Sequence, residues 1–140
     1  LTLAVSLHGP TDELRRRLVP GMSQWGISDL MDACREYVGK TGRRLTFEYC
    51  LLSGVNDAVV DAEELARLVR GINCHVNLIP YNRVPDAEFR ASLQMRVRGF
   101  RQILELRGIP VTQRDSRGAD IDGACGQLRR RADRTSHRAG

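Results

Sequence analysis

Short apolar, β-rich runs alternate with amphipathic helical segments along the whole 140-residue chain. The strand-like runs cover residues 1–7, 44–52, 74–80 and 109–114. Between them, apolar residues recur at helical spacing, as Val97, Phe100 and Leu104 do. Strands that alternate with helices form parallel sheets, because each crossover helix returns the chain to the same edge. We therefore predict an α/β fold of about four parallel strands with crossover helices.

Two α/β architectures fit this alternation: a doubly wound open sheet, and part of a (β/α) barrel. The sequence contains no internal repeat and no low-complexity linker, so we expect one domain over residues 1–128 and a basic tail over residues 129–140. Both architectures place their chemistry beyond the carboxyl ends of the strands. Polar residues that follow the strands are therefore the first candidates for function.

Residues that cap helices predict where the helical segments begin and end. Ser28 and Ser92 each precede an apolar stripe and are expected N-caps. Asp61 and Glu64 have the spacing of a capping box and predict the start of a further helix. Gly39 and Gly42 follow the last apolar position of their segment, and either predicts a helix end.

The charge and hydropathy favour a soluble protein with a polyanionic partner. A net charge of +5 arises from 22 Lys and Arg against 17 Asp and Glu, with an arginine cluster in residues 129–140. Arginines bind phosphates, so RNA is a natural partner, although taken alone a frayed, solvated terminus is the simpler interpretation. No apolar run approaches the roughly 20 residues of a membrane helix, and the first residues lack a signal-peptide pattern. We therefore expect a cytoplasmic protein without a membrane partner.

The four cysteines are spaced too irregularly for a disulfide framework or a structural zinc site. Cys34, Cys50, Cys74 and Cys125 are separated by 16, 24 and 51 residues. The first two lie on apolar faces and are expected in the core. Cys125 lies in a Gly-Ala-Cys-Gly run behind Arg117, where small neighbours expose the thiol and a cation favours the thiolate. We expect Cys125 to be a nucleophile and no metal ligands in this chain.

Polar side chains at two strand ends are candidates for ligand binding. Ser6 and His8 close the first strand before a Gly-Pro turn, and their hydroxyl and imidazole suit ribose hydroxyls or a carboxylate. A lone histidine at a strand end is nevertheless more often structural. Asn82 follows the third strand, and its amide suits an adenine edge or the amino-acid end of a cofactor. For Asn82 the functional and structural interpretations are equally favoured.

Four further polar residues have a strong structural interpretation. Asn56 and Asp57 lie in a Gly-Val-Asn-Asp turn and are better explained by that turn than by function. Asn77 also has a mainly structural interpretation. Glu48 lies inside the second strand, where an ionised carboxylate is costly unless it faces a polar interior. Binding and structural roles are equally favoured for Glu48.

Several sequence blocks together resemble the radical S-adenosylmethionine (SAM) methyltransferases that methylate adenine in ribosomal RNA, at carbon 2 in one family and at carbon 8 in its relative. The matching blocks are Leu3-Ala4-Val5-Ser6-Leu7-His8, Leu14-Arg15 to Pro20, Thr41-Gly42-Arg43-Arg44, Phe47-Glu48-Tyr49, Gly54-Val55-Asn56-Asp57, Val76-Asn77-Leu78-Ile79-Pro80-Tyr81-Asn82, Ser116-Arg117-Gly118, Asp120-Ile121 and Ala124-Cys125-Gly126-Gln127-Leu128. The resemblance implies part of a (β/α) radical-SAM barrel. Gly9 and Gly123 stand where the family often has alanine, which leaves the implied chemistry untouched.

The resemblance also implies roles for particular residues. Ser6, Leu7, His8 and Asn82 would line the SAM site, and Cys125 would accept a methyl group from one SAM. A radical generated from a second SAM at a 4Fe-4S cluster would then activate that methyl group for addition to adenine. The implied substrates are 23S ribosomal RNA and, as a second class, transfer RNA, and a further implied partner is an electron donor that reduces the cluster.

One family signature is missing from the chain, the Cys-x3-Cys-x2-Cys motif that holds the cluster. We therefore expect a C-terminal part covering about the last third to two fifths of the family's length, inactive alone and poorly soluble because a sheet edge is exposed. Two alternatives stay open. One is the carbon-8 methyltransferase, and the other is a non-catalytic RNA-binding α/β module.

Overall fold

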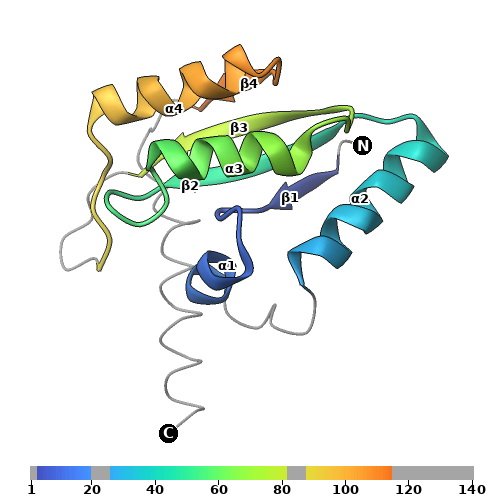
Figure 1. Ribbon diagram of the computed structural model, residues 1–140, viewed down its shortest axis with the longest axis horizontal. Coiled ribbons are helices and arrows are strands. Elements are labelled where there is room, and N and C mark those ends of the chain that lie inside the picture. Colours follow the sequence, from blue (N-terminus) through green and yellow to red (C-terminus); the bar gives the residue numbers. More distant parts are fainter. Residues whose placement is uncertain (1–2, 20–25, 82–87, 115–140) are drawn as a thin grey trace, which may run out of the picture.

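A computed structural model describes residues 3–19, 26–81 and 88–114 (Figure 1). The elements are β1 (Ala4–Ser6), α1 (Asp12–Leu18), α2 (Ile27–Thr41), β2 (Leu45–Leu51), α3 (Val59–Val69), β3 (Cys74–Pro80), α4 (Gln94–Leu106) and β4 (Val111–Gln113). The predicted alternation of strands and helices is confirmed. None of the helices in these ranges has the length and apolar character needed to cross a bilayer.

The strands form one parallel sheet whose spatial order, β1-β2-β3-β4, follows the chain. The longest pairing joins β2 to β3 in register from Leu45 opposite Cys74 to Leu51 opposite Pro80. A doubly wound sheet reverses its strand order at a switch point, whereas a (β/α) barrel adds strands in sequence. The observed order matches a barrel segment, and the predicted α/β fold with about four parallel strands is confirmed.

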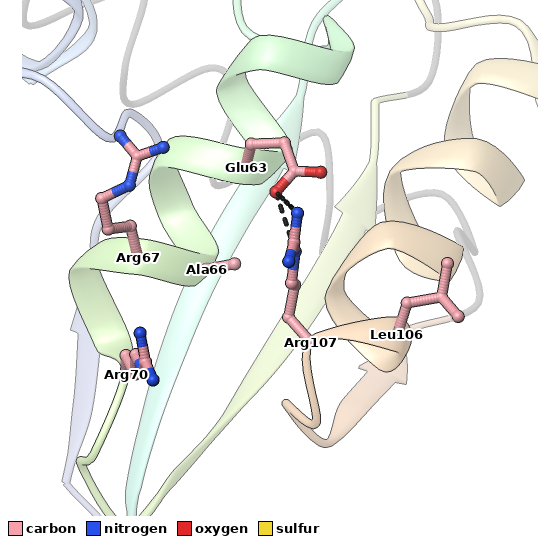
Figure 2. Close-up of a pocket in the computed structure, with 6 residues that line it drawn as sticks. All are labelled: Glu63, Ala66, Arg67, Arg70, Leu106 and Arg107. Atoms are coloured by element: carbon pink, nitrogen blue, oxygen red, sulfur yellow. Dashed lines mark hydrogen bonds and ion pairs between the residues drawn. The ribbon is translucent and has the colours of Figure 1, made fainter.

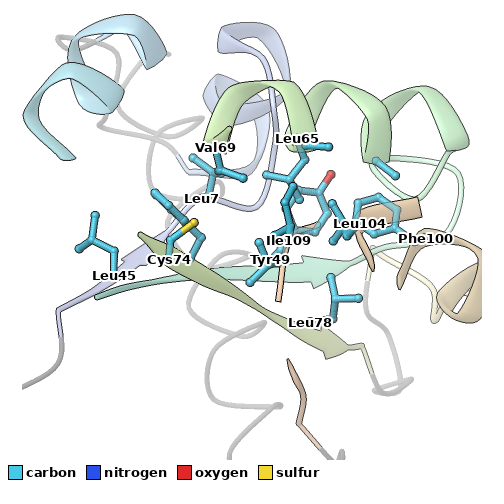
Figure 3. Packing of buried hydrophobic residues seen from close by; sticks show 14 of the residues in the cluster. Leu7, Leu45, Tyr49, Leu65, Val69, Cys74, Leu78, Phe100, Leu104 and Ile109 are labelled. Carbon is cyan, nitrogen blue, oxygen red and sulfur yellow. The ribbon is translucent and has the colours of Figure 1, made fainter. Parts of the chain in front are cut away.

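One face of the sheet packs against α2, α3 and α4 to form the main hydrophobic core (Figure 3). Strand β2 contributes Leu45, Phe47, Tyr49 and Leu51 to it, each fully buried. The ring of Tyr49 lies 5.1 Å from that of Phe100 on α4, measured between centroids. Alternate residues of a strand point to opposite faces, so this row leaves Thr46, Glu48 and Cys50 on the second face of the sheet.

Three predicted helix starts are wrong, because none of the expected caps is the N-cap of its helix. Helix α2 begins at Ile27, whose backbone N–H donates to Asp12 Oδ1 at 2.7 Å, one residue before Ser28. Helix α4 begins after Leu93, and Ser92 Oγ instead donates to Asp57 Oδ2 at 2.8 Å.

The third wrong start belongs to α3, which begins two residues before Asp61. The Asp61 carboxylate accepts from the Ala58 backbone N–H at 3.1 Å, so Asp61 caps from inside the first turn. Of the two glycines predicted to end α2, Gly42 does so, since it has a φ of 67° and its N–H donates to the Val38 carbonyl at 2.8 Å, whereas Gly39 lies inside the helix.

Candidate functional site

The carboxyl end of β1 makes a tight turn at His8. The N–H of Gly9 donates to the Leu7 carbonyl at 2.7 Å across His8, which has a φ of 56°. A positive φ is unusual for any residue except glycine, and such strain clusters at functional sites. Gly9 packs closely for a different reason, because a Cβ there would lie 2.8 Å from Leu14 Cβ, and an alanine would require Leu14 to shift. The turn is thereby pressed directly against the first residues of α1.

The His8 imidazole is held in one tautomer. Its Nδ1 accepts a hydrogen bond from the Cys50 backbone N–H at 2.9 Å, so the neutral ring carries its proton on Nε2. The residue is only 5% exposed. Burial, with a smaller contribution from the nearby Arg15 charge, lowers the pKa of His8 to about 4. At neutral pH the site therefore presents an uncharged imidazole as an Nε2–H donor.

Asn56 joins the end of β1 to the end of β2. Its Nδ2 donates to the carbonyls of His8 at 2.7 Å and Cys50 at 2.8 Å, and its Oδ1 accepts from the Leu52 N–H at 2.8 Å. The Asn56 carbonyl accepts from Tyr49 Oη at 2.7 Å, and the side chain is fully buried. The structural interpretation of Asn56 is confirmed, and its role extends beyond its own turn because it fixes the backbone of His8.

Asp57 completes the same turn. One carboxylate oxygen accepts from the Gly54 N–H at 3.0 Å and the other from Ser92 Oγ. These contacts connect the loop after β2 to the segment before α4, and the predicted structural role of Asp57 is confirmed.

Arg15 lies beneath the His8 turn; it belongs to a block that matches the family, but no role was predicted for it. The residue is 3% exposed, and its Nε donates to the Leu7 carbonyl at 3.3 Å. Burial lowers the pKa of the guanidinium, although nearby Asp12 opposes that shift. Arg15 shares a helix face with the buried Leu18, three residues on, and that spacing is the signal that separates it from Arg16 and Arg17.

The residues proposed to line the SAM site lie in different environments. Ser6 is exposed on the second face of the sheet, and His8 lies at its carboxyl edge. The Leu7 side chain is fully buried in the main core, so only its backbone lies near the turn, where its N–H donates to the Glu48 carbonyl at 2.9 Å. Asn82 and Cys125 lie outside the described residues, as does the predicted tail.

The second face of the sheet carries two kinds of side chain. Near the carboxyl edge, Cys50 and its register partner Ile79 are covered by Leu18 and Val19 at the end of α1 and by Phe89. Two residues nearer the amino ends of the strands, a row of polar side chains crosses all four strands.

The members of this polar row are Ser6, Glu48, Asn77 and Thr112. Thr112 Oγ1 donates to Asn77 Oδ1 at 3.2 Å. Apolar groups beside hydroxyl, amide and carboxylate groups fit a ligand such as SAM, which has an apolar adenine face and charged ends.

The described cysteines do not make a cluster site. Cys34, Cys50 and Cys74 are buried and are not joined in disulfides, and burial raises the pKa of the Cys74 thiol to about 11. Within the three described ranges, His, Cys, Asp and Glu side chains do not gather in threes as metal ligands would. The chemistry available to these residues is therefore binding and hydrogen bonding.

A cavity of about 410 Å³ lies between α3 and α4, toward the C-terminal ends of these helices (Figure 2). Its lining residues are Glu63, Ala66, Arg67, Arg70, Leu106 and Arg107. Arg107 forms an ion pair with Glu63 at 3.0 Å, and both groups reach solvent. Basic residues at helix C-termini complement the helix dipole, which explains this cluster without a ligand.

Comparison with known proteins gives a consistent result. The chain is 50% identical over 131 residues to a probable dual-specificity RNA methyltransferase RlmN of Clostridium tetani, and 55% identical over 132 residues to that of Pelotomaculum thermopropionicum. Each match covers 94% of this chain, which spans 38% and 36% of the two relatives. No family model matches the chain.

Solved structures show the same relationship. A radical SAM methyltransferase from Sphaerobacter thermophilus is 58% identical, with a TM-score of 0.83 over 91% of this chain and 37% of that protein. A domain of pyruvate-formate lyase-activating enzyme from Bacteroides vulgatus shares the fold at 16% identity and a TM-score of 0.63. The chain therefore corresponds, in sequence and in fold, to the C-terminal part of the RlmN-type dual-specificity RNA methyltransferases.

Proposed function

We propose that this chain is the C-terminal part of a cytoplasmic radical SAM enzyme that methylates carbon 2 of adenine in 23S ribosomal RNA, with transfer RNA as a second substrate. The chain spans about two fifths of its curated relatives, so the complete activity requires residues beyond it. The main support is the rigid His8 turn at the carboxyl end of β1, beside a polar row on the second face of the sheet.

The described residues would act by binding and orienting SAM. The neutral His8 ring, held by the Cys50 N–H, offers an Nε2–H to a carboxylate or ribose oxygen, and the Asn56 bond to the His8 carbonyl fixes the backbone of the turn. Ser6 lies two residues before His8 and is exposed on the second face of the sheet, where it offers a hydroxyl to the same ligand. A 4Fe-4S cluster, reduced by an external electron donor, would supply the radical chemistry when bound by cysteines beyond this chain.

Cys125 would carry the methyl group. Its thiolate attacks the methyl carbon of SAM, forming an S–CH₃ bond while the departing sulfur takes the electron pair of the broken bond as S-adenosylhomocysteine. Carbon 2 of adenine is electron-poor and a weak nucleophile, so a methyl group activated on a tethered sulfur avoids a direct attack on the sulfonium.

The proposal is tested with the full-length protein that contains this chain. After incubation with 23S ribosomal RNA and SAM under reducing, anaerobic conditions, mass spectrometry should find methyladenine, and the position of the methyl group should be carbon 2. Methylation at carbon 8 would support the relative, and RNA binding without methylation would support a non-catalytic module. The proposal also requires a three-cysteine cluster motif in the upstream coding sequence.

A second measurement tests Cys125 itself. Peptide mass spectrometry of the purified protein should find one added methyl group on Cys125, lost in Cys125→Ala. The matched control is Cys34→Ala, whose thiol is buried in the core, and which should leave the Cys125 modification in place. Methyl groups on Cys34 or Cys74 at equal abundance would contradict the assignment.

A further inference from the structure

Glu48 occupies the middle of the polar row on the second face of the sheet. In register, Ser6 of β1 lies opposite Glu48 on one side and Asn77 of β3 lies opposite it on the other. Adjacent strands lie about 4.8 Å apart, so the three side chains are immediate neighbours on this face. A carboxylate in the middle of an interior strand is therefore flanked by a hydroxyl and an amide.

The described surroundings leave the charge of Glu48 uncompensated. The residue is half-buried, and none of the ion pairs among the described residues includes it. Its own backbone carbonyl is engaged by the N–H groups of Leu7 at 2.9 Å and His8 at 3.3 Å, which holds the strand in place. A half-buried carboxylate without a positive neighbour attracts the cationic group of a ligand that lies on this face.

The residues around Glu48 on the second face of the sheet limit where a cationic group can approach it. On the carboxyl side, Cys50 and Ile79 are buried under α1, which makes an apolar boundary. On the amino side, Thr46 and His75 face each other, with 3.4 Å between Thr46 Oγ1 and the His75 ring nitrogens. Along the row, Thr112 Oγ1 donates to Asn77 Oδ1, which orients that amide. The Glu48 carboxylate is the group in this row that attracts a cation.

We propose that Glu48 is a specificity-determining residue that binds the positively charged part of SAM, with Asn77 orienting the contact. This inference rests on the proposed function, because it takes SAM as the ligand of this face. SAM has two cationic groups, the sulfonium and the α-ammonium, and a carboxylate attracts either.

The test is equilibrium binding to the full-length protein carrying Glu48→Gln, which keeps the side-chain shape and removes the charge. The dissociation constant for SAM should rise tenfold or more. S-adenosylhomocysteine has the same ammonium group but a neutral sulfur. If its affinity falls equally, Glu48 faces the ammonium, and if its affinity is unchanged, Glu48 faces the sulfonium. Either result supports the proposal.

Glu63→Gln is the matched control, because it makes the same change of charge on α3 in the ion pair with Arg107, and SAM affinity should not change. Glu48→Asp keeps the charge but retracts it, and should bind SAM more tightly than Glu48→Gln. Circular dichroism of each variant confirms folding. A SAM affinity within twofold of the wild type in folded Glu48→Gln would overturn the inference.

The inference and the proposed function fail separately. If the wild type methylates RNA and Glu48→Gln binds SAM normally, only the role of Glu48 is lost. If the wild type binds SAM through Glu48 but leaves RNA unmethylated, only the proposed function is lost.

Discussion

The two faces of the sheet differ sharply, as the seven residues of β2 show, because their side chains alternate between the two faces. The face toward α2, α3 and α4 receives four fully buried apolar side chains from that strand. The second face receives Thr46, Glu48 and Cys50, and only the last of these lies in an apolar cluster. Helix packing therefore makes one face the source of stability. The other face carries the polar row of Ser6, Glu48, Asn77 and Thr112.

Removing a large side chain from the helix-covered face should have the largest effect on stability. We expect Phe47→Ala to lower the free energy of unfolding by about 4 kcal/mol, because it leaves a cavity in a fully buried site. Urea unfolding followed by circular dichroism measures this loss. The neighbouring Glu48→Ala on the second face should cost less than about 1 kcal/mol. Equal losses would contradict the division between the two faces.

The junction where the two faces meet at the strand ends should be nearly as sensitive. We expect Asn56→Ala to cost about 3 kcal/mol, because the Leu52 N–H and the carbonyls of His8 and Cys50 lose buried partners. The same unfolding measurement applies, with the exposed Gln102→Ala on α4 as an amide-to-alanine control expected near zero. A small effect for Asn56→Ala would mean that the strand ends hold together without it.

The smallest of the three effects is a dependence of stability on pH. Folding lowers the pKa of His8 from 6.5 to about 4, so between these values the unfolded chain binds more protons than the folded one. The His8 contribution is complete above pH 6.5 and falls as the pH drops toward 4, by about 2 kcal/mol between pH 7 and pH 5. Unfolding measured across this range should show the loss.

His8→Asn is the control for that prediction. The Asn Oδ1 replaces Nδ1 as the acceptor for the Cys50 N–H, and Asn tolerates a positive φ. The loss of stability between pH 7 and pH 5 should then be smaller by about 2 kcal/mol, the contribution of His8. An unchanged profile would assign the dependence to other groups.

The strands were predictable because apolar runs bounded by turns are a local signal. Strand β3 has the predicted limits, residues 74–80, and β2 lies inside the predicted 44–52. The helix starts were less predictable. Ser92 has the composition of a cap, but it bonds to Asp57, 35 residues away in sequence. A local pattern cannot reveal a competing partner that only the fold brings near.

The candidate site divides in the same way. Ser6 and His8 were identifiable as polar residues that end a strand, whereas the His8 tautomer depends on the Cys50 N–H, 42 residues away. Asn56 has an ordinary turn sequence that conceals its bond to His8 across 48 residues. Buried Arg15 lies among three consecutive arginines, and only its spacing to Leu18 distinguishes it.

By itself, the sequence determined the α/β class, the strand positions and the resemblance to a methyltransferase, because periodicity and motifs are encoded locally. Only the tertiary structure decided the strand order, the two faces and the alignment of Ser6, Glu48, Asn77 and Thr112 in one row. That row depends on the register of four strands, and register arises when every apolar side chain of the opposite face is buried at once. A polar residue on one face is thus positioned by the packing of the other.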